Sequence, residues 1–370
     1  MTNTAGFPSG ALSRRDLLRR GAVLAGGLAA LGGAGTLLSA CGSGGGGGGG
    51  SKRVVVADWG GALQEAEKKH IFDPFSKETG IEVVIAGPPT TAKIKAMVDT
   101  GNVEWDLIAG GPSTVLPVGR DYFEDLPDRL RTIPGIDPSY VDPKWLTYYL
   151  FSVVLAWNTK ALGSAKLAGW QDMWDVGKFP GKRTLRGADQ GVPPDLEFAL
   201  LSDGVPRDKV YPVDLDRAFG RLQQLKPNVP QWWTAGSQPG QMLVSGQVVA
   251  ASMFSGRVDA LRKEGAPLDF TWNGGMLQLA SWSVPRGAPN KEAAFKLAEY
   301  SVRPEVQAAV WSNYNNGPAN SKALDLMDKN LALSMPSYPA NAEVQFLNDA
   351  AWWGKNREAV LKRFQQFAAT

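Results

Sequence analysis

The chain has 370 residues, of which 44% are hydrophobic and 20% charged, which is enough for two lobes with their own cores. Its net charge of +3 gives no reason to expect a nucleic acid as partner. One cysteine and one histidine exclude a disulfide framework and a multi-cysteine metal site, and nearly exclude Ser-His-Asp chemistry. We therefore expect no metal, no cofactor and no enzymatic activity.

The first forty residues have the pattern of an export signal. Four arginines between positions 14 and 20 precede a small apolar stretch, Gly21 to Leu38. That stretch is short for a membrane span, which needs about 20 apolar residues, and glycines interrupt it. Ser13 to Leu18 resembles the twin-arginine export motif, although the general secretory route stays open. We therefore expect residues 1–40 to be a signal peptide.

The segment around the single cysteine resembles a lipid-attachment signal. Leu38-Ser39-Ala40-Cys41 is similar to a bacterial lipobox, which implies a diacylglycerol on Cys41 after cleavage before it. The glycine run that follows cannot form a core, and roughly ten flexible residues reach about 17 Å. Residues 41–51 are therefore expected to be a lipidated cysteine and its tether, on the outer face of the cytoplasmic membrane.

The chain after residue 52 alternates between strand and helix patterns. Strands are expected at 53–58, 81–85 and 106–109, with helices at 63–77 and 92–99 between them. This order with short links predicts an α/β fold with a parallel sheet covered on both faces. A second such unit is expected from helices at 238–245 and 258–263 and strands at 248–253 and 268–272. Two separate α/β units predict two lobes.

Two apolar segments rich in β-forming residues could connect these lobes. They are Trp145 to Asn158, "WLTYYLFSVVLAWN", and Gly274 to Pro285, "GGMLQLASWSVP". The first could equally be an ordinary core strand. Residues 291–300, 304–313 and 343–367 are expected to be mainly helical.

Seven segments, in order over nearly all of residues 53–365, resemble the extracellular solute-binding proteins of ATP-driven importers, in the spermidine/putrescine-binding branch. They are "VVVADWGGALQEAEKKHIFDPFSKETGIEVV", "EWDLIAGGPSTV", "LAWNTKAL", "WQDMWDVGKFPGKRTLR", "LEFALLSDGV", "WWTAGSQPGQMLVSGQVVAASMFSGRVDAL" and "SWSVPRGAPNKEAAFKLAEYSVRPEVQAAV". The resemblance implies a monomer that captures a small solute and hands it to the permease subunits of an ABC importer.

The resemblance also implies a periplasmic-binding-protein type II fold, in which hinge strands join two lobes around a central cleft. Lobe 1 would be residues 53–155 plus 280–315, and lobe 2 residues 156–279 plus 316–370. The hinges would lie near Val153–Ala156, Leu279–Trp282 and Asn313–Gly317.

The expected ligand-binding residues follow strand ends or lie on the crossing strands, because ligands of open α/β sheets bind beyond the carboxyl ends of strands. Glycine lets backbone N–H groups approach a ligand, and indole offers a flat face. The set is Trp59, Gly60, Gly61, Gly111, Ser113, Trp233, Phe254, Ser255, Arg257, Gln278, Ser281 and Trp282.

The charge of the solute is the point at which the sequence departs from the polyamine pattern. The aspartate that the family carries in the returning hinge strand aligns with Ala280, and an aromatic residue two positions earlier aligns with Gln278. Arg186 and Arg257 would repel a polycation. Acidic candidates to replace the aspartate are Asp189, Asp195 and Glu197. A polyamine or related organic cation, an anionic or zwitterionic solute, a sugar-like solute and a surface interaction module therefore all stay open.

Overall fold

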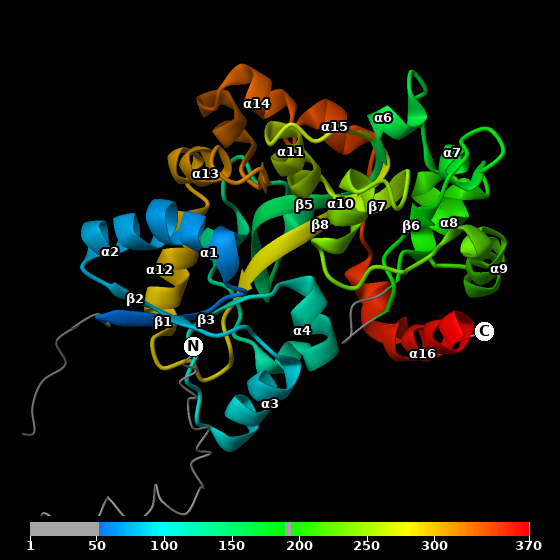
Figure 1. Cartoon of the computed structure of the whole chain (residues 1–370). Helices are drawn as coiled ribbons and strands as arrows, with labels where there is room; N and C mark the ends of the chain where they lie inside the picture. The colour runs from blue at the N-terminus through cyan, green and yellow to red at the C-terminus, as the bar shows by residue number, and fades with distance from the viewer. Residues whose placement is uncertain (1–51, 189–193, 370) are drawn as a thin grey trace, which may run out of the picture. The chain divides into compact units, whose positions relative to one another are not determined.

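The computed structural model describes residues 52–188 and 194–369 (Figure 1). The expected signal peptide, Cys41, the tether and Asp189 lie outside these residues. In the part of the chain that is described, no helix is both long and apolar enough to cross a membrane.

Two groups of buried apolar residues divide the described elements into lobe 1 and lobe 2. The elements of lobe 1 are β1 (Arg53–Ala57), α1 (Gly61–Glu67), η1 (Lys68–Phe72), α2 (Asp73–Thr79), β2 (Glu82–Ala86), α3 (Thr91–Thr100), β3 (Leu107–Ala109), α4 (Pro112–Val118), η2 (Arg120–Tyr122), α5 (Asp128–Arg131), η3 (Pro138–Tyr140), β4 (Val141–Asp142), α12 (Lys291–Ser301), α13 (Pro304–Trp311), β9 (Gly317–Pro318) and η6 (Ser321–Leu326).

The elements of lobe 2 are α6 (Thr159–Leu162), α7 (Trp170–Trp174), β6 (Arg183–Thr184), α8 (Leu196–Ser202), η4 (Arg207–Lys209), α9 (Leu215–Leu225), η5 (Lys226–Asn228), α10 (Gln238–Val244), β7 (Ala250–Phe254), α11 (Ser255–Lys263), β10 (Phe346–Leu347) and α16 (Ala350–Ala369). The short helices α14 (Lys329–Leu333) and α15 (Pro339–Glu343) connect η6 to β10, and the strands β5 (Trp145–Asn158) and β8 (Leu268–Ser283) run through both lobes.

Strand β1 shows why lobe 1 has a layered α/β architecture. Val54 and Val56 pack into one core cluster, whereas Val55 and Ala57 pack into another. Because alternate side chains of a strand point to opposite faces, both faces of the sheet are buried under helices. Strand β1 pairs in parallel with β2 and β3, as the alternating pattern predicted.

The helix expected at 63–77 extends from residue 61 to residue 79 and contains one π-helical turn, η1. It ends at Gly80, whose φ of 72° is the left-handed conformation that glycine adopts readily.

Strands β5 and β8 form the centre of the sheet, whose order is β2-β1-β3-β8-β5-β7-β6. They pair antiparallel from Leu146 opposite Trp282 to Asn158 opposite Leu268, and appear as two long neighbouring ribbons in Figure 1. The strand expected at 268–272 and the apolar segment that begins at Gly274 are thus one strand. A register shift between Val153 and Leu155 accommodates its glycines.

The core changes from one lobe to the other along both long strands. On β5, Tyr149 belongs to the lobe 1 cluster and Val153 to the lobe 2 cluster. On β8, Met276 packs in lobe 2 and Trp282 in lobe 1. On β5, the transition from the lobe 1 core to the lobe 2 core therefore lies a few residues before the expected lobe boundary at residue 155. On β8, the expected boundary at residue 279 lies between Met276 and Trp282, where the core changes.

Residues 316–327 were expected in lobe 2, but they pack on lobe 1. The Asn320 amide donates to the Val302 carbonyl at 3.0 Å, and its backbone N–H donates to Gln307 at 2.9 Å. Met327 packs against the lobe 1 cluster. These buried polar groups find their partners in lobe 1, so the chain reaches the lobe 2 core only at β10.

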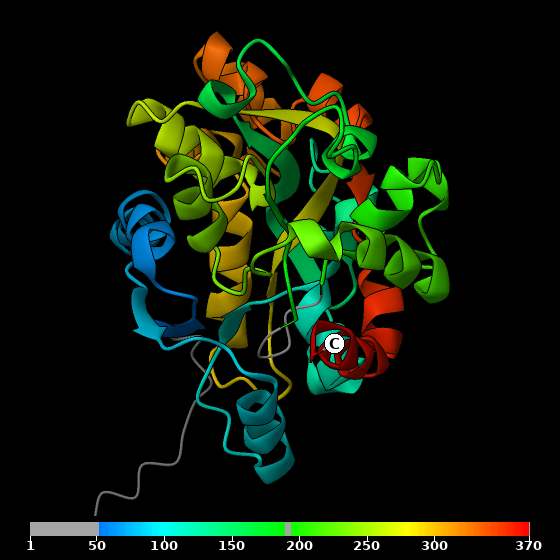
Figure 2. The same ribbon diagram turned by 45° about the vertical axis from the view of Figure 1, so that its right-hand side comes forward.

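The lobes also meet away from the long strands. Helix α16 of lobe 2 lies beside α4 of lobe 1 in both views (Figures 1 and 2), and a Cβ on Gly354 would lie 3.2 Å from the Leu116 Cβ.

Substitutions of Gly111 and Gly60 by alanine test how closely the chain before α4 approaches β8. Both have a positive φ with ψ near 180°, but a Cβ on Gly111 would lie 2.5 Å from the Ser281 Cβ, whereas Gly60 has nothing within 4 Å. Gly60→Ala should cost about 1–3 kcal/mol of backbone strain. Gly111→Ala should cost this amount plus about 1–3 kcal/mol for overpacking, seen as a lower thermal midpoint. Equal midpoints for the two variants would contradict the close approach.

Candidate functional site

The first part of the site lies where β1 and β3 end in lobe 1. Trp59 follows β1, has an exposed fraction of 56%, and its indole N–H donates to the Ala109 carbonyl at 2.7 Å. Gly60 and Gly61 follow it and lead into α1. Because β1 and β3 are parallel neighbours, their carboxyl ends place Trp59 at the edge expected for a ligand wall.

The turn after β3 lies against β8. The Gly110 N–H donates to the Ser281 carbonyl at 2.9 Å, and Gly111 is buried against the Ser281 side chain. Ser113 is exposed in the first turn of α4, where its hydroxyl makes a long 3.4 Å contact with the Gly110 carbonyl. Of these expected residues, Ser113 presents a side chain to solvent and Gly111 serves packing.

The second part of the site lies in lobe 2, at the carboxyl end of β7. Phe254 ends the strand and is half-buried, and Ser255, which is buried, begins α11. Arg257 is exposed in the first turn of this helix. A Cβ on Gly236 would lie 3.2 Å from both the Arg257 Nε and the Phe254 ring, so the guanidinium and the ring are neighbours. No carboxylate of the described residues lies within ion-pair distance of Arg257.

Four aromatic side chains connect the two parts, and we call them the aromatic wall: Phe151 and Phe254, which are half-buried, and Tyr149 and Trp233, which are buried behind them. Successive ring centroids are 6.0, 5.9 and 5.8 Å apart, which are normal separations for packed aromatic pairs. Tyr149 and Phe151 were not among the expected residues. Their positions in an apolar strand carry no signal that distinguishes a ligand wall from a core.

Gln278 and Ala280 lie beside the aromatic wall. Phe151 is directly opposite Gln278 and Tyr149 directly opposite Ala280 in the pairing of β5 with β8. Residues directly opposite each other point to the same face of a sheet, so both β8 side chains share the face of the wall. The Gln278 amide nitrogen is buried and has no partner among the described residues.

Trp282 and Ser281 are corrections to the expected site, because both side chains are buried in packing contacts. Trp282 stacks on Tyr148 at 4.1 Å and donates its indole N–H to the Ser301 hydroxyl at 3.0 Å. Ser281 forms a 2.8 Å hydrogen bond with Thr147. A large indole stabilises the fold more when it is buried with its N–H hydrogen-bonded than when it is exposed at the edge of a cleft. Trp282 therefore does not line the cleft. Trp233 is a further correction, because it is buried, donates its indole N–H to the Ser252 hydroxyl at 3.1 Å and packs against Phe254.

The acidic candidates of lobe 2 already have partners. Asp195 forms an ion pair with Arg186, with 2.9 Å between the carboxylate and the guanidinium, and also accepts a hydrogen bond from Ser252. Burial raises the pKa of Asp195, against the opposing effect of Arg186. The Glu197 carboxylate accepts from Tyr211 at 2.5 Å and from Trp353 at 2.7 Å. Neither group is available to replace a hinge carboxylate.

A buried carboxyl pair in lobe 1, Asp58 and Glu67, was missed from the sequence. Their exposed fractions are 1% and 0%, and each has one oxygen without a hydrogen-bond partner among the described residues. Tyr148 donates its hydroxyl to Glu67 at 2.8 Å, and the Trp59 N–H donates to Asp58 at 2.6 Å. Burial raises the pKa of Glu67 well above its ordinary value, and the charge of Asp58 raises it further.

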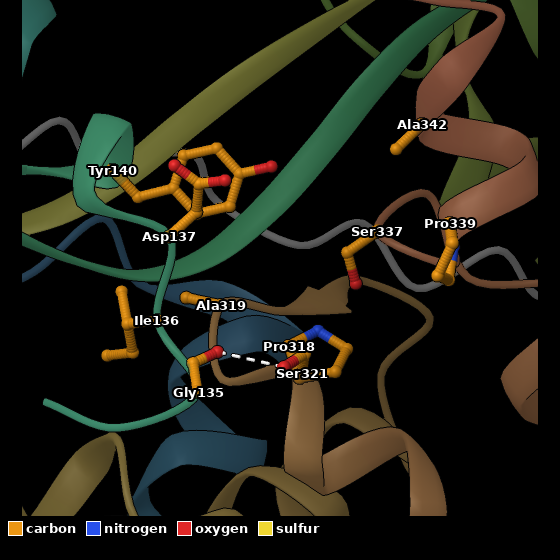
Figure 3. Close-up of a pocket in the computed structure, with 10 residues that line it drawn as sticks. All are labelled: Gly135, Ile136, Asp137, Tyr140, Pro318, Ala319, Ser321, Ser337, Pro339 and Ala342. Carbon is orange, nitrogen blue, oxygen red and sulfur yellow. Dashed lines mark hydrogen bonds between the residues drawn. The ribbon is translucent and has the colours of Figure 1, made fainter.

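A separate hollow of about 380 Å³ lies elsewhere on the surface (Figure 3). The residues that line it are Gly135, Ile136, Asp137, Tyr140, Pro318, Ala319, Ser321, Ser337, Pro339 and Ala342. None of them is an expected ligand-binding residue. Within the described ranges, no group of three or more His, Cys, Asp or Glu side chains could hold a metal ion.

Glu67 makes stability depend on pH with a defined sign. Its pKa is raised in the folded state from the ordinary value of 4.5, so the folded protein binds the proton more tightly than the unfolded chain. The stability from this group is complete below pH 4.5 and is lost as the pH rises through the folded pKa. Glu67→Gln cannot ionise and can still accept from Tyr148. Its thermal midpoint should therefore rise relative to wild type as the pH increases.

Glu65→Gln, an exposed change on the same helix, is the control for this measurement. A midpoint difference between Glu67→Gln and wild type that stays constant with pH would contradict the raised pKa.

The comparisons with known proteins agree with this architecture. Residues 70–344 match the family described as bacterial extracellular solute-binding protein. The chain is 36% identical to the gamma-aminobutyric acid-binding protein of Pseudomonas aeruginosa, over 85% of this chain and 90% of that protein. It is 23% identical to the spermidine/putrescine-binding periplasmic protein of Escherichia coli, over 76% of this chain and 82% of that protein.

Two solved structures are similar over nearly their whole length. A GABA receptor has a TM-score of 0.78 and 32% identity, covering 85% of this chain and 97% of that one. An ABC transporter substrate-binding protein from Bradyrhizobium japonicum has a TM-score of 0.78 and 36% identity, covering 86% and 99%. These relatives are solute-binding proteins of transporters, not enzymes. With its two lobes and crossing strands, the chain belongs to the family of bacterial extracellular solute-binding proteins, as a substrate-binding protein of an ABC transporter.

Proposed function

We propose that this protein captures a small zwitterion, with one amine and one carboxylate, between its lobes and delivers it to the permease of an ABC importer. The observation that carries the proposal is Arg257, an exposed guanidinium beside Phe254 of the aromatic wall with no carboxylate partner in the described chain. Such a group binds a carboxylate through charge-assisted hydrogen bonds. Its position in the first turn of the nine-residue helix α11 favours an anion further.

A polyamine fits this wall less well than a zwitterion. The β8 residue opposite Tyr149 is Ala280, which offers no charge to an ammonium, and Arg257 would repel a second cationic end. The relatives whose names state gamma-aminobutyric acid are 36% and 32% identical to this chain, against 23% for the spermidine/putrescine-binding protein of Escherichia coli. Gamma-aminobutyrate is therefore the first solute to test.

Calorimetric titration of residues 51–370 tests the proposal. Gamma-aminobutyrate should bind more tightly than putrescine or spermidine, and at a hundredfold excess over its Kd it should stabilise the fold by about 2.7 kcal/mol. Arg257→Gln should weaken binding by about tenfold or more, because one charged hydrogen-bond donor is lost. Lys263→Gln, at the other end of the same helix, is the matched control. Binding of the polyamines alone would overturn the proposal.

We further propose that Cys41 anchors the protein to the membrane. Its lipobox-like surroundings and the glycine run after it support this proposal. A single cysteine gives the test a clear readout: the full chain should partition into the membrane fraction of a bacterial host, whereas Cys41→Ser should remain soluble after export. A Cys41→Ser variant that stayed in the membrane fraction would contradict the anchor and leave solute binding unaffected.

A further inference from the structure

We infer that the Asp58–Glu67 pair supplies the negative charge that holds the ammonium of the solute at the lobe 1 end of the aromatic wall. The solute then lies with its ammonium toward lobe 1 and its carboxylate toward Arg257 in lobe 2. This inference rests on the proposed function and deepens it, since it assigns an orientation and a specificity determinant to the same cleft.

The charge of the pair is not compensated by a basic side chain within the described protein. Neither carboxyl group is within ion-pair distance of a described lysine or arginine, although both are almost completely buried. The hydrogen bonds that they accept come from the Tyr148 hydroxyl and the Trp59 backbone, which are neutral donors. Burial, and then the charge of the neighbouring Asp58, raise the pKa of Glu67, so Glu67 holds its proton beside the charge of Asp58. A buried charge without a counter-ion is costly, so a cation nearby is favoured.

The pair is connected to the aromatic wall through Tyr148. The Glu67 carboxylate holds the Tyr148 hydroxyl at 2.8 Å, and the Tyr148 ring packs edge-on against Tyr149 at 4.7 Å. Tyr149 begins the wall and faces Ala280 across the strands. On the other side, Asp58 immediately precedes Trp59, whose exposed indole stands at the cleft edge. The buried Tyr149 thus separates the pair from the rest of the wall, and the exposed Trp59 indole is the aromatic face next to the pair that can contact an ammonium.

The lobe 2 end of the aromatic wall has two arginines beside it, Arg186 and Arg257. Trp233 packs beside Arg186, but that guanidinium is neutralised by Asp195 at 2.9 Å. Arg257 is therefore the cation beside the wall that lacks a carboxylate partner in the described chain. One uncompensated negative charge in lobe 1 and one uncompensated positive charge in lobe 2 match a zwitterion in a single orientation.

The experiment compares three probes that differ only in their charged ends: gamma-aminobutyrate, butyrate, which lacks the ammonium, and butylamine, which lacks the carboxylate. Their Kd values are measured for wild type, for the double variant Asp58→Asn/Glu67→Gln, which removes the charge of the pair, and for Glu65→Gln as a charge control on α1. Circular dichroism and thermal unfolding establish that each variant is folded.

The double variant should bind gamma-aminobutyrate about tenfold or more weakly and butyrate with little change, so the preference for the amine is lost. General damage to the cleft would weaken both probes equally, and that outcome would overturn the inference. The Glu65→Gln control should keep the wild-type preference.

Arg257→Gln supplies a measurement that does not depend on the folding of the double variant. It should lose the preference for gamma-aminobutyrate over butylamine and keep the preference over butyrate. The opposite pattern would reverse the orientation and overturn the inference while the proposed function stands. Failure of wild type to bind gamma-aminobutyrate would overturn the proposed function, and the inference with it.

Discussion

The antiparallel pairing of β5 with β8 is the constraint on which the cleft depends. These strands have 14 and 16 residues and carry the backbone from one lobe to the other and back, so the lobes share one hydrogen-bonded ladder. Its register fixes which side chains share the face of the aromatic wall: Tyr149 opposite Ala280, and Phe151 opposite Gln278. A slip of one residue would turn this whole set to the other face. The aromatic wall is therefore a property of the register and not of any single side chain.

Burial of charge differs between the two lobes. In lobe 2, Arg186 pairs with Asp195, and burial raises the pKa of Glu197 while the charge of Arg186 has a smaller, lowering effect on it. In lobe 1, no described lysine or arginine lies within ion-pair distance of Asp58 or Glu67, and burial together with the charge of Asp58 raises the pKa of Glu67. A paired buried charge supports the local packing, whereas an uncompensated one favours whatever brings a counter-charge. Under the proposed orientation of the solute, this difference gives the two walls of the cleft different chemical roles.

The sequence predicts a strand from Trp145 to Asn158, because this segment is an uninterrupted run of β-forming residues, but it left open whether the strand crosses between the lobes. It also predicts that Trp59 directly follows a buried strand, and the structure places it, exposed, after the end of β1. It could not assign Trp282, because its indole is buried by a stacking contact with Tyr148, 134 positions away. The burial of Glu67 could not be predicted for the same reason. The charged residues near it in the sequence are exposed, and its partner Tyr148 lies 81 positions further along the chain. Contacts between distant segments decide these side chains, and local patterns do not report them.

If the solute binds in the orientation that we propose, the lobes can close only on a solute that carries opposite charges at its two ends. A receptor of this kind reports occupancy through its differential affinity for the open and closed states. A dication would satisfy the Asp58–Glu67 pair but bring an ammonium toward Arg257, and a dianion would do the reverse. In either case closure would remove water from a charge without replacing it by a partner, which costs several kcal/mol. A zwitterion of matching length satisfies both ends at once. Selectivity then arises from the penalty on incorrect solutes as much as from attraction to the correct one.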